Sequence, residues 1–183
     1  MKYSELSLGQ VEAIVNKLGG MDGVRLFLAN NLKVVEVSVI TTTHHLIVDY
    51  TKSFDEMVRA GKYFSMSYAF EKSHFPMTTG DAVEVDVTLI HFNHEIRSSN
   101  VAVEELNKIG YRPATIEELL SFGATYPDIQ KQFTIVALGS SYRGMVPYLS
   151  GYNSEYGSRE RSVGMGTREG ILNGNFRFLA VRK

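Results

Sequence analysis

The sequence contains no cysteine and no tryptophan. Without cysteine the chain can form no disulfide bond, thiolate zinc site, iron–sulfur cluster or cysteine nucleophile. It also contains no run near the roughly 20 apolar residues that a membrane-spanning helix needs. Residues 1–20 lack the apolar core of a secretory signal peptide. We therefore expect a soluble protein with no membrane partner, and we take the cytoplasm as its default location.

An excess of charge of either sign is missing as well, because 19 basic residues stand against 20 acidic ones and the formal net charge is -1. Such a balance gives no broad positive field, so general attraction to nucleic acid is not expected. Hydrophobic residues make up 44% of the 183-residue chain, and ten Phe with ten Tyr can supply a core. That length suits one domain, or one domain with a small appendage.

Residues 4–30 have the pattern of two short helices joined by a turn. Ser7 and Gln10 form a capping box, in which each side chain satisfies the backbone N–H of the other residue. The pair Gly19-Gly20 ends the first helix, and Asp22 can cap the second. Helices this short cannot bury their apolar faces alone. We expect this hairpin to dock on the rest of the chain or on a partner, including a second copy of the protein.

The pattern changes from helical to strand-like near Asn31, where we place a boundary between the hairpin, residues 1–32, and a single domain, residues 33–183. Alternation of apolar and polar residues, which is typical of strands with one buried face, is clearest from Val83 to His91. Further strands are predicted at 33–39, 46–48, 133–138 and 176–182. We expect the last two to pair with each other.

Three helices are predicted in this domain, at 54–61, 99–109 and 115–123. Capping boxes mark the starts of two of them, through Ser53 with Glu56 and Thr115 with Glu118. We expect an α+β fold with a mainly antiparallel or mixed sheet. Its helices should lie on one face, where those at 99–109 and 115–123 cover the sheet.

The composition shifts after Gly139. Eight of the sixteen glycines lie between Gly139 and Gly174, together with several tyrosines, serines and arginines. Glycine-rich segments without a clear period are typical of turns and loops. We therefore predict an irregular Gly/Tyr-rich C-terminal region, with one strand at Met145–Leu149.

Three segments of the chain are distinctive together: residues 46–63, residues 83–140 with GYRPATIEELL and YPDIQKQFTIVALGS, and the final RFLAVRK. They resemble a family of small uncharacterised bacterial proteins that is frequent in candidate-phylum genomes. The resemblance covers residues 46–183 and implies no functional residues, because that family has no assigned function. A segment rich in Trp and Asp usually precedes RFLAVRK in the family, whereas this chain has Gly, Tyr, Arg and Asn there. The layout is also similar to C-type-lectin-like folds, at the level of the fold alone.

The tyrosines and arginines of residues 140–170 suggest a contact surface. Tyrosine gives a large contact area with few rotatable bonds, glycine and serine allow adaptable loops, and arginine recognises phosphate, carboxylate and aromatic groups. We predict a non-catalytic binding or interaction module for a protein or a small ligand, without a cofactor. Its predicted contact residues are Tyr142, Arg143, Tyr148, Tyr152, Tyr156, Arg159, Arg161 and Arg168. The other reading is a long loop that its own tyrosines pack on the sheet.

Two further functions remain open. A metal-dependent enzyme could be centred on His91 and His94, three residues apart at a strand end, with further ligands from His44, His45, His74 or Glu95. That spacing is loose, and His91 also fits as the last inward-facing residue of its strand. The second alternative is single-stranded nucleic acid, which suits aromatic side chains beside arginines. The nearly neutral charge disfavours it.

No motif for a nucleophile or a nucleotide is present. Ser140 and Ser141 follow a predicted strand but lack the G-x-S-x-G pattern of a nucleophile elbow, so we expect turn serines. The glycines of residues 164–170 do not have dinucleotide-binding spacing. Glu117 and Glu118 form a carboxylate pair that we expect on a solvated helix face, with Glu118 acting as a cap. We therefore name no catalytic residue.

Overall fold

The computed structural model describes residues 7–18, 20–29, 40–153, 158–167, 169–172 and 175–183 of the chain. The chain divides into two compact units, Met1–Val37 and Ser38–Lys183. The predicted boundary at residues 32 and 33 and the predicted strand at 33–39 lie outside the described residues. Within the described part of the chain, no helix is both long and apolar enough to cross a membrane.

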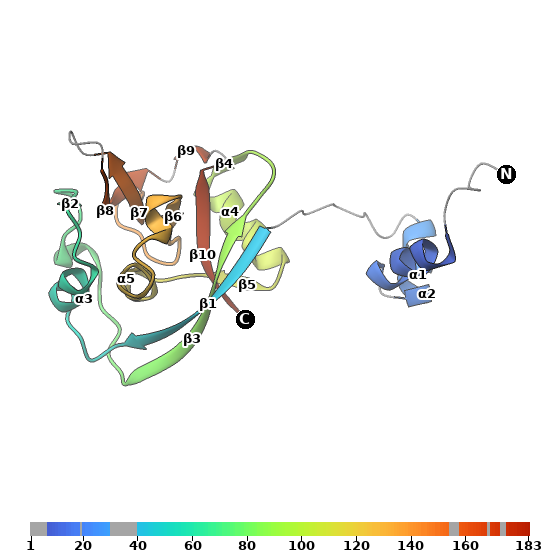
Figure 1. The fold of residues 1–183 in the computed structure, drawn as a ribbon, viewed down its shortest axis with the longest axis horizontal. Coiled ribbons are helices and arrows are strands. Elements are labelled where there is room, and N and C mark those ends of the chain that lie inside the picture. The colour runs from blue at the N-terminus through green and yellow to red at the C-terminus, as the bar shows by residue number, and fades with distance from the viewer. Residues whose placement is uncertain (1–6, 19, 30–39, 154–157, 168, 173–174) are drawn as a thin grey trace. The chain divides into compact units, whose positions relative to one another are not determined.

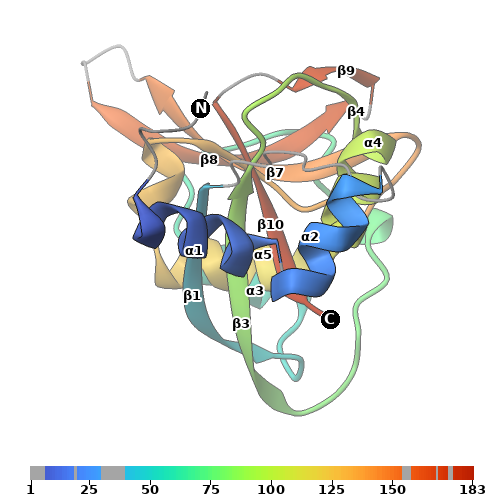
Figure 2. The same cartoon turned by 90° about the vertical axis from the view of Figure 1, so that its right-hand side faces the viewer.

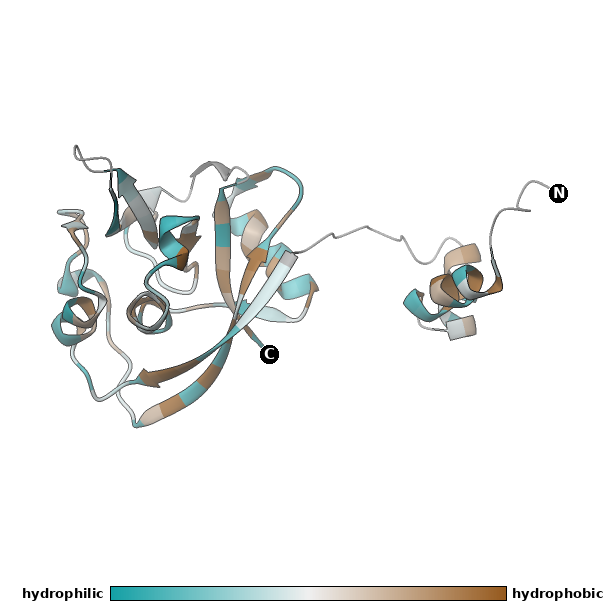
Figure 3. Cartoon of the chain, in the orientation of Figure 1, coloured by the Kyte–Doolittle hydropathy of each residue, from teal (hydrophilic) through white to brown (hydrophobic). Residues whose placement is uncertain are grey.

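The first unit is a helical hairpin, as the sequence predicts, made of α1 (Leu8–Lys17) and α2 (Gly20–Leu28) (Figure 1). Its capping box is formed, because Ser7 N–H donates to Gln10 Oε1 at 2.8 Å and Gln10 N–H donates to Ser7 Oγ at 3.3 Å. Of the described residues in these helices only Gly23 is buried. Leu8 and Leu28 are 77% and 74% exposed. The two helices therefore do not bury their apolar residues, brown in Figure 3, against each other.

The second unit is built on a mixed eight-stranded sheet (Figures 1 and 2). Seven strands follow one another in the order β1 (Ile40–Asp49), β3 (Ala82–His91), β10 (Phe176–Arg182), β6 (Thr134–Val136), β7 (Met145–Asn153), β8 (Arg159–Thr167) and β2 (Ser65–Met66). The eighth strand, β5 (Tyr111–Pro113), pairs with β10. A separate two-stranded sheet joins β4 (Ile96–Ser98) and β9 (Glu169–Leu172). The pairs β10–β6 and β2–β8 are parallel, and the other pairs are antiparallel.

The predicted strands form the centre of this sheet. Phe178 of β10 lies opposite Ile90 of β3 on one side and Val136 of β6 on the other. The predicted pairing of the final strand with residues 133–138 is therefore confirmed. The pattern at 46–48 belongs to the longer strand β1, which pairs with β3 along its whole length. Side chains alternate between the two faces of a strand, and Figure 3 shows this alternation of colour along β3.

Residues 145–167, where the sequence predicts one short strand in an irregular region, contain the regular antiparallel pair β7 and β8. The glycines that suggest a loop allow this pair to form. Tyr148 of β7 lies opposite Gly164 of β8, and a Cβ on Gly164 would come within 3.0 Å of the Tyr148 ring. An aromatic ring that covers a cross-strand glycine stabilises a strand that the glycine alone would weaken. The region is therefore more regular than the sequence predicts.

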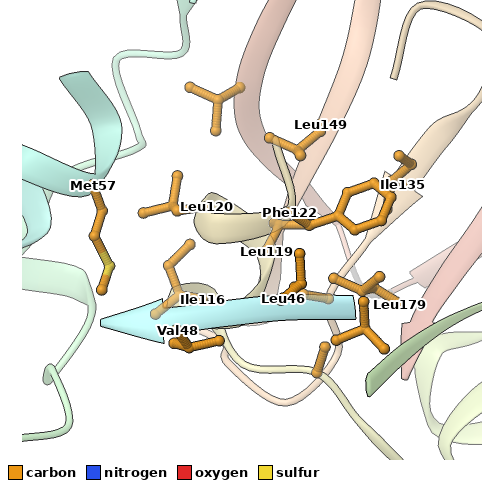
Figure 4. Packing of buried hydrophobic residues seen from close by; sticks show 14 of the residues in the cluster. Leu46, Val48, Met57, Ile116, Leu119, Leu120, Phe122, Ile135, Leu149 and Leu179 are labelled. Carbon is orange, nitrogen blue, oxygen red and sulfur yellow. The ribbon is translucent and has the colours of Figure 1, made fainter. Parts of the chain in front are cut away.

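The helices α3 (Phe54–Gly61) and α5 (Ile116–Thr125) pack against each other, and α5 packs on β1. From α5, Ile116, Leu119 and Phe122 enter a buried cluster with Leu46 of β1 and Leu179 of β10 (Figure 4). Burying one such side chain contributes about 1.5–3 kcal/mol. This cluster therefore makes a large contribution to the stability of the second unit.

The helix α4 (Ser99–Lys108), predicted on the same face as α5, lies on the other face of the sheet (Figure 1). Ala102 and Leu106 of α4 are fully buried, but neither belongs to the cluster around α5. Leu179 points into that cluster, so its strand neighbour Phe178 points to the opposite face, together with Ile90. The prediction that the helices lie on one face of the sheet therefore holds for α5. The helix α3 lies on the same face as α5, whereas α4 lies on the opposite face.

Candidate ligand pocket

A cavity of about 340 Å³ lies beside the first turn of α5. Three segments line it: the end of the short helix η1 (Lys72–His74) with the residues after it, the start of α5, and the turn after β6. Apart from Phe75, Pro76 and Gly139 the lining is polar and consists of His74, Thr78, Thr115, Glu117, Ser140 and Ser141. The volume of the cavity is at the lower end of the range of small-ligand pockets in proteins, about 300–1,000 Å³.

Glu117 is the second residue of α5 and is only 2% exposed. Its Oε1 accepts a hydrogen bond from Thr78 N–H at 2.8 Å, while its Oε2 receives none from the described residues. The first turn of a helix favours a negative charge, because unpaired N–H groups point there. The sequence predicts Glu117 on a solvated face. That prediction is wrong because the segment that contains Thr78 covers the start of α5.

The neighbouring Glu118, also predicted on a solvated face, is fully buried. Arg112 Nη2 and Nη1 donate to its two oxygens at 2.6 and 3.0 Å. Thr115 N–H donates to Glu118 Oε2 at 2.8 Å, which is the predicted cap. The hydrogen bond to Glu118 raises the pKa of Arg112. Glu118 therefore has its charge compensated inside the protein, whereas Glu117 has not.

The hydroxyl groups of Ser140 and Thr115, two residues that line the cavity, also differ in whether they form a hydrogen bond. Ser140 Oγ accepts a hydrogen bond from Ile116 N–H at 2.9 Å, so it satisfies a free donor at the start of α5. This matches the turn role expected for Ser140. Thr115 Oγ1 faces Glu118 N–H across the capping box but makes no hydrogen bond of ordinary geometry with any described residue. A buried polar group left without a partner costs about 1–3 kcal/mol.

His74 connects the cavity to two of the predicted contact residues. Its Nδ1 lies 2.9 Å from the Ala69 carbonyl oxygen, which can only accept, so Nδ1 carries a proton. The His74 ring stacks on the Tyr142 ring, with centroids 3.8 Å apart and planes 11° from parallel. The Arg143 guanidinium lies 5.3 Å from the centre of the same tyrosine ring. Tyr142 and Arg143 therefore adjoin the cavity.

Two other predicted contact residues have structural partners. Tyr148 covers Gly164 across the β7–β8 pair. Arg161 Nη1 donates to the Gly123 carbonyl oxygen and Arg161 Nη2 to the Lys62 carbonyl oxygen, each at 3.2 Å. These bonds join β8 to α5 and to the end of α3. Both side chains therefore have contacts within the second unit, on strands rather than on the long loop of the alternative prediction.

The remaining predicted contact residues lie away from the cavity or outside the described chain. Tyr152 is 47% exposed at the end of β7. Its ring stacks on Phe64, which is 67% exposed, with centroids 6.2 Å apart. Arg159, at the start of β8, is exposed as well. Tyr156 and Arg168 lie outside the described residues.

The two histidines of the metal hypothesis have other neighbours. Arg177 Nη1 lies 3.0 Å from His91 Nδ1. His91 Nδ1 also lies 3.3 Å from the Phe176 carbonyl oxygen, and the guanidinium charge disfavours a metal cation at this place. The His94 ring lies against Phe92, with centroids 5.7 Å apart. Among the described residues, no group of three or more His, Asp or Glu side chains is placed to hold a metal ion.

Comparison with known proteins gives no relative for this chain. No family model, no curated protein and no solved structure matches it. The resemblance to the family of small uncharacterised bacterial proteins, and the weaker one to C-type-lectin-like folds, therefore stay predictions.

Proposed function

We propose that the chain is a non-catalytic binding module that takes a small polar ligand into the cavity at the start of α5. The proposal depends above all on Glu117 Oε2, which accepts no hydrogen bond from the described residues although Glu117 is only 2% exposed and lines the cavity. Buried polar atoms in proteins are almost always hydrogen-bonded to protein, water or ligand. A ligand with a hydrogen-bond donor would complete the bonding of Glu117 Oε2.

Of the contact surface predicted at residues 140–170, the proposal retains only residues 140–143. Ser140 and Ser141 line the cavity, and Tyr142 adjoins it through the stack with His74. Arg143 is exposed beside Tyr142. Residues further along the β7–β8 pair are left out, because their side chains pack on the body or lie at its other end.

The hydrogen bonds around the cavity favour binding over catalysis. A serine nucleophile needs a base within hydrogen-bond reach, but Ser140 Oγ instead accepts from Ile116 N–H. Within the described residues, no imidazole or carboxylate is hydrogen-bonded to Ser140 or Ser141. His74 is held at Nδ1 by the Ala69 carbonyl group. The cavity therefore contains acceptors and ring surfaces without an assembled nucleophile and base.

An NMR screen of small polar fragments tests the proposal. Fragments that bind are expected to shift the backbone amide signals of Thr78, Ile116 and Ser140. Tyr142→Ala should weaken their binding by up to about tenfold, because it removes the ring that holds His74 in place. Tyr152→Ala removes an equally large ring from the same predicted surface and should leave binding unchanged.

The melting temperature of each variant shows whether its fold survives. Fragments that shift amide signals only at the far end of β7 would place the contact surface around Tyr152 instead. Equal binding by the Tyr142→Ala and unmodified proteins would remove Tyr142 from the site. A screen with no shift at any of the three amides would contradict the proposed function.

A second proposal concerns the N-terminal hairpin. We propose that its exposed apolar face packs on the hairpin of a second copy of the chain. The described hairpin carries Glu12, Lys17, Asp22 and Arg25, two positive and two negative charges, so two hairpins do not repel each other. Helices too short to be stable alone gain stability when four of them pack around a shared apolar core.

A further inference from the structure

We propose that the cavity at the start of α5 recognises a primary ammonium group, and that Glu117 is the residue that selects it. This inference rests on the proposed function, because it names the chemical class of ligand for the same cavity. Aliphatic amines belong to this class, since they are protonated at neutral pH just as the lysine side chain is.

The charge of Glu117 has no counterpart in the described part of the protein. The side chain is 2% exposed, and its hydrogen bond comes from the neutral Thr78 N–H. Arg112, on the strand before α5, is already held by two hydrogen bonds to Glu118. Among the described residues that line the cavity there is no lysine or arginine. Because a buried carboxylate is stable only when it is paired or hydrogen-bonded, the complementary ligand charge is positive.

The positive end of the α5 helix does not replace this cation. Its partial charge is about half an elementary charge, and two carboxylates, Glu117 and Glu118, lie in the same first turn. One free N–H of that turn, at Ile116, is already satisfied by Ser140. A negatively charged ligand would therefore meet an uncompensated carboxylate, and a neutral ligand would leave its charge in place.

The available acceptors also suit an ammonium group, which has three N–H donors and no acceptor. Glu117 Oε2 is a charged acceptor that receives no hydrogen bond from the described residues. The hydroxyl groups of Thr78 and Ser141 belong to the same lining. A carboxylate or phosphate ligand carries acceptors and no donor, so it could not form a hydrogen bond with the Glu117 carboxylate.

Titration with n-butylammonium chloride, followed by NMR of the backbone amides, tests this inference. Sodium butyrate and n-butanol serve as probes of similar size with opposite and zero charge. We expect saturable shifts of the Thr78, Ile116 and Glu117 amide signals with n-butylammonium and none with butyrate. Glu117→Gln keeps an oxygen that can accept from Thr78 but removes the charge, so it should weaken n-butylammonium binding at least about tenfold.

Glu104→Gln is the matched control, because it makes the same change of net charge at an exposed residue of α4. It should leave n-butylammonium binding unchanged, and an equal loss in both variants would overturn the role of Glu117. The comparison of the three probes on the unmodified protein remains decisive even if Glu117→Gln does not fold.

The outcomes also separate this inference from the proposed function. If n-butanol shifts the same amide signals as strongly as n-butylammonium does, the cavity binds a ligand without selecting its charge. The inference is then overturned, and the proposed function stands. If none of the three probes shifts those signals, the inference is overturned, and the fragment screen decides whether the proposed function stands.

Discussion

Lys62 and Arg143 are the non-glycine residues of the described chain that have a left-handed backbone, each with a φ of 47°. Lys62 is the C-cap of α3. Arg143 and Gly144, at a φ of 75°, form a two-residue turn closed by backbone hydrogen bonds of 2.8 and 2.9 Å between Tyr142 and Met145. A residue with a Cβ loses about 1–2 kcal/mol in this conformation. Strain of this kind, kept beside a cavity, motivates a contact role for Arg143.

Arg143→Asn is expected to stabilise the fold, because Asn tolerates a positive φ and Asn-Gly is the preferred pair for this turn. A gain of about 1 kcal/mol would raise the melting temperature by about 2–4 °C in a chain of this size. Lys62→Asn should give a similar gain by relieving the same strain at a distance from the cavity. Calorimetry measures the melting temperature of both variants.

Ligand binding distinguishes the same two variants. If Arg143 contacts the ligand, Arg143→Asn should weaken the binding seen in the fragment screen, while Lys62→Asn should not. A stabilised Arg143→Asn protein that binds fragments as well as the unmodified chain would assign Arg143 to the turn alone. A variant with no gain in melting temperature would contradict the argument from strain.

The sequence predicts the structural role of some cavity residues but not of others. Ser140 could be predicted as a turn serine, because Ser after a strand and a glycine is a local signal. The burial of Glu117 could not be predicted, since it depends on Thr78, a residue 39 positions earlier that folds back onto the start of α5. The carboxylate pair alone looks like an ordinary exposed helix face. Only the segment that contains Thr78 decides whether Glu117 is exposed or buried.

Among the elements, the Arg112–Glu118 pair attaches α5 to β5, and β5 in turn pairs with β10. The pair therefore fixes the start of α5, where the cavity lies. Glu118 is fully buried, while the Arg112 side chain is 42% exposed. Removing one partner of a buried pair leaves the other without its hydrogen bonds, which costs more than the pair contributes when intact.

Glu118→Ala is expected to destabilise the second unit by about 3 kcal/mol, the low end of the range for breaking a buried pair, because Arg112 can still reach solvent. Urea unfolding measures the loss. Glu105→Ala breaks the more exposed pair with Lys108 on α4 and is the matched control. It should cost less than about 1 kcal/mol. Equal small losses in both variants would show that the Arg112–Glu118 pair does not hold α5 in place.

The elements that the sequence predicts best are those with local signals. The capping boxes that begin α1 and α3 need residues only three positions apart, and both are formed. The β7–β8 pair depends on a contact across strands, in which Tyr148 covers Gly164. Read along the chain, that glycine indicates a loop. The side of the sheet that α4 covers is equally non-local, because it follows from packing rather than from the pattern of α4 itself.

At the scale of the whole molecule, the two units differ in how much apolar surface they bury. The buried cluster of the second unit runs from Leu46 to Leu179, and its members among the described residues all belong to that unit. The described hairpin buries little within itself. The stability of the second unit should therefore not depend on the hairpin, whereas the hairpin needs another surface to pack on.

Deleting residues 1–37 is expected to leave the unfolding temperature of the second unit unchanged, because its buried cluster stays complete. The same deletion should abolish self-association, because it removes the apolar face proposed to join two copies. Light scattering during size-exclusion chromatography measures the mass of each protein. The full chain should approach the mass of a dimer as its concentration rises, and the shortened chain should remain a monomer.

Point variants show whether the apolar face itself causes this association. Ile14→Ser with Leu26→Ser changes two hairpin residues that are 48% and 49% exposed and should give a monomer. Ile47→Ser with Val83→Ser makes the same kind of change at residues of the second unit that are 62% and 48% exposed, and should leave the dimer intact. A full chain that stays monomeric at every concentration would contradict the hairpin contact. A lower unfolding temperature for the shortened chain would instead show that the second unit depends on the hairpin for part of its stability.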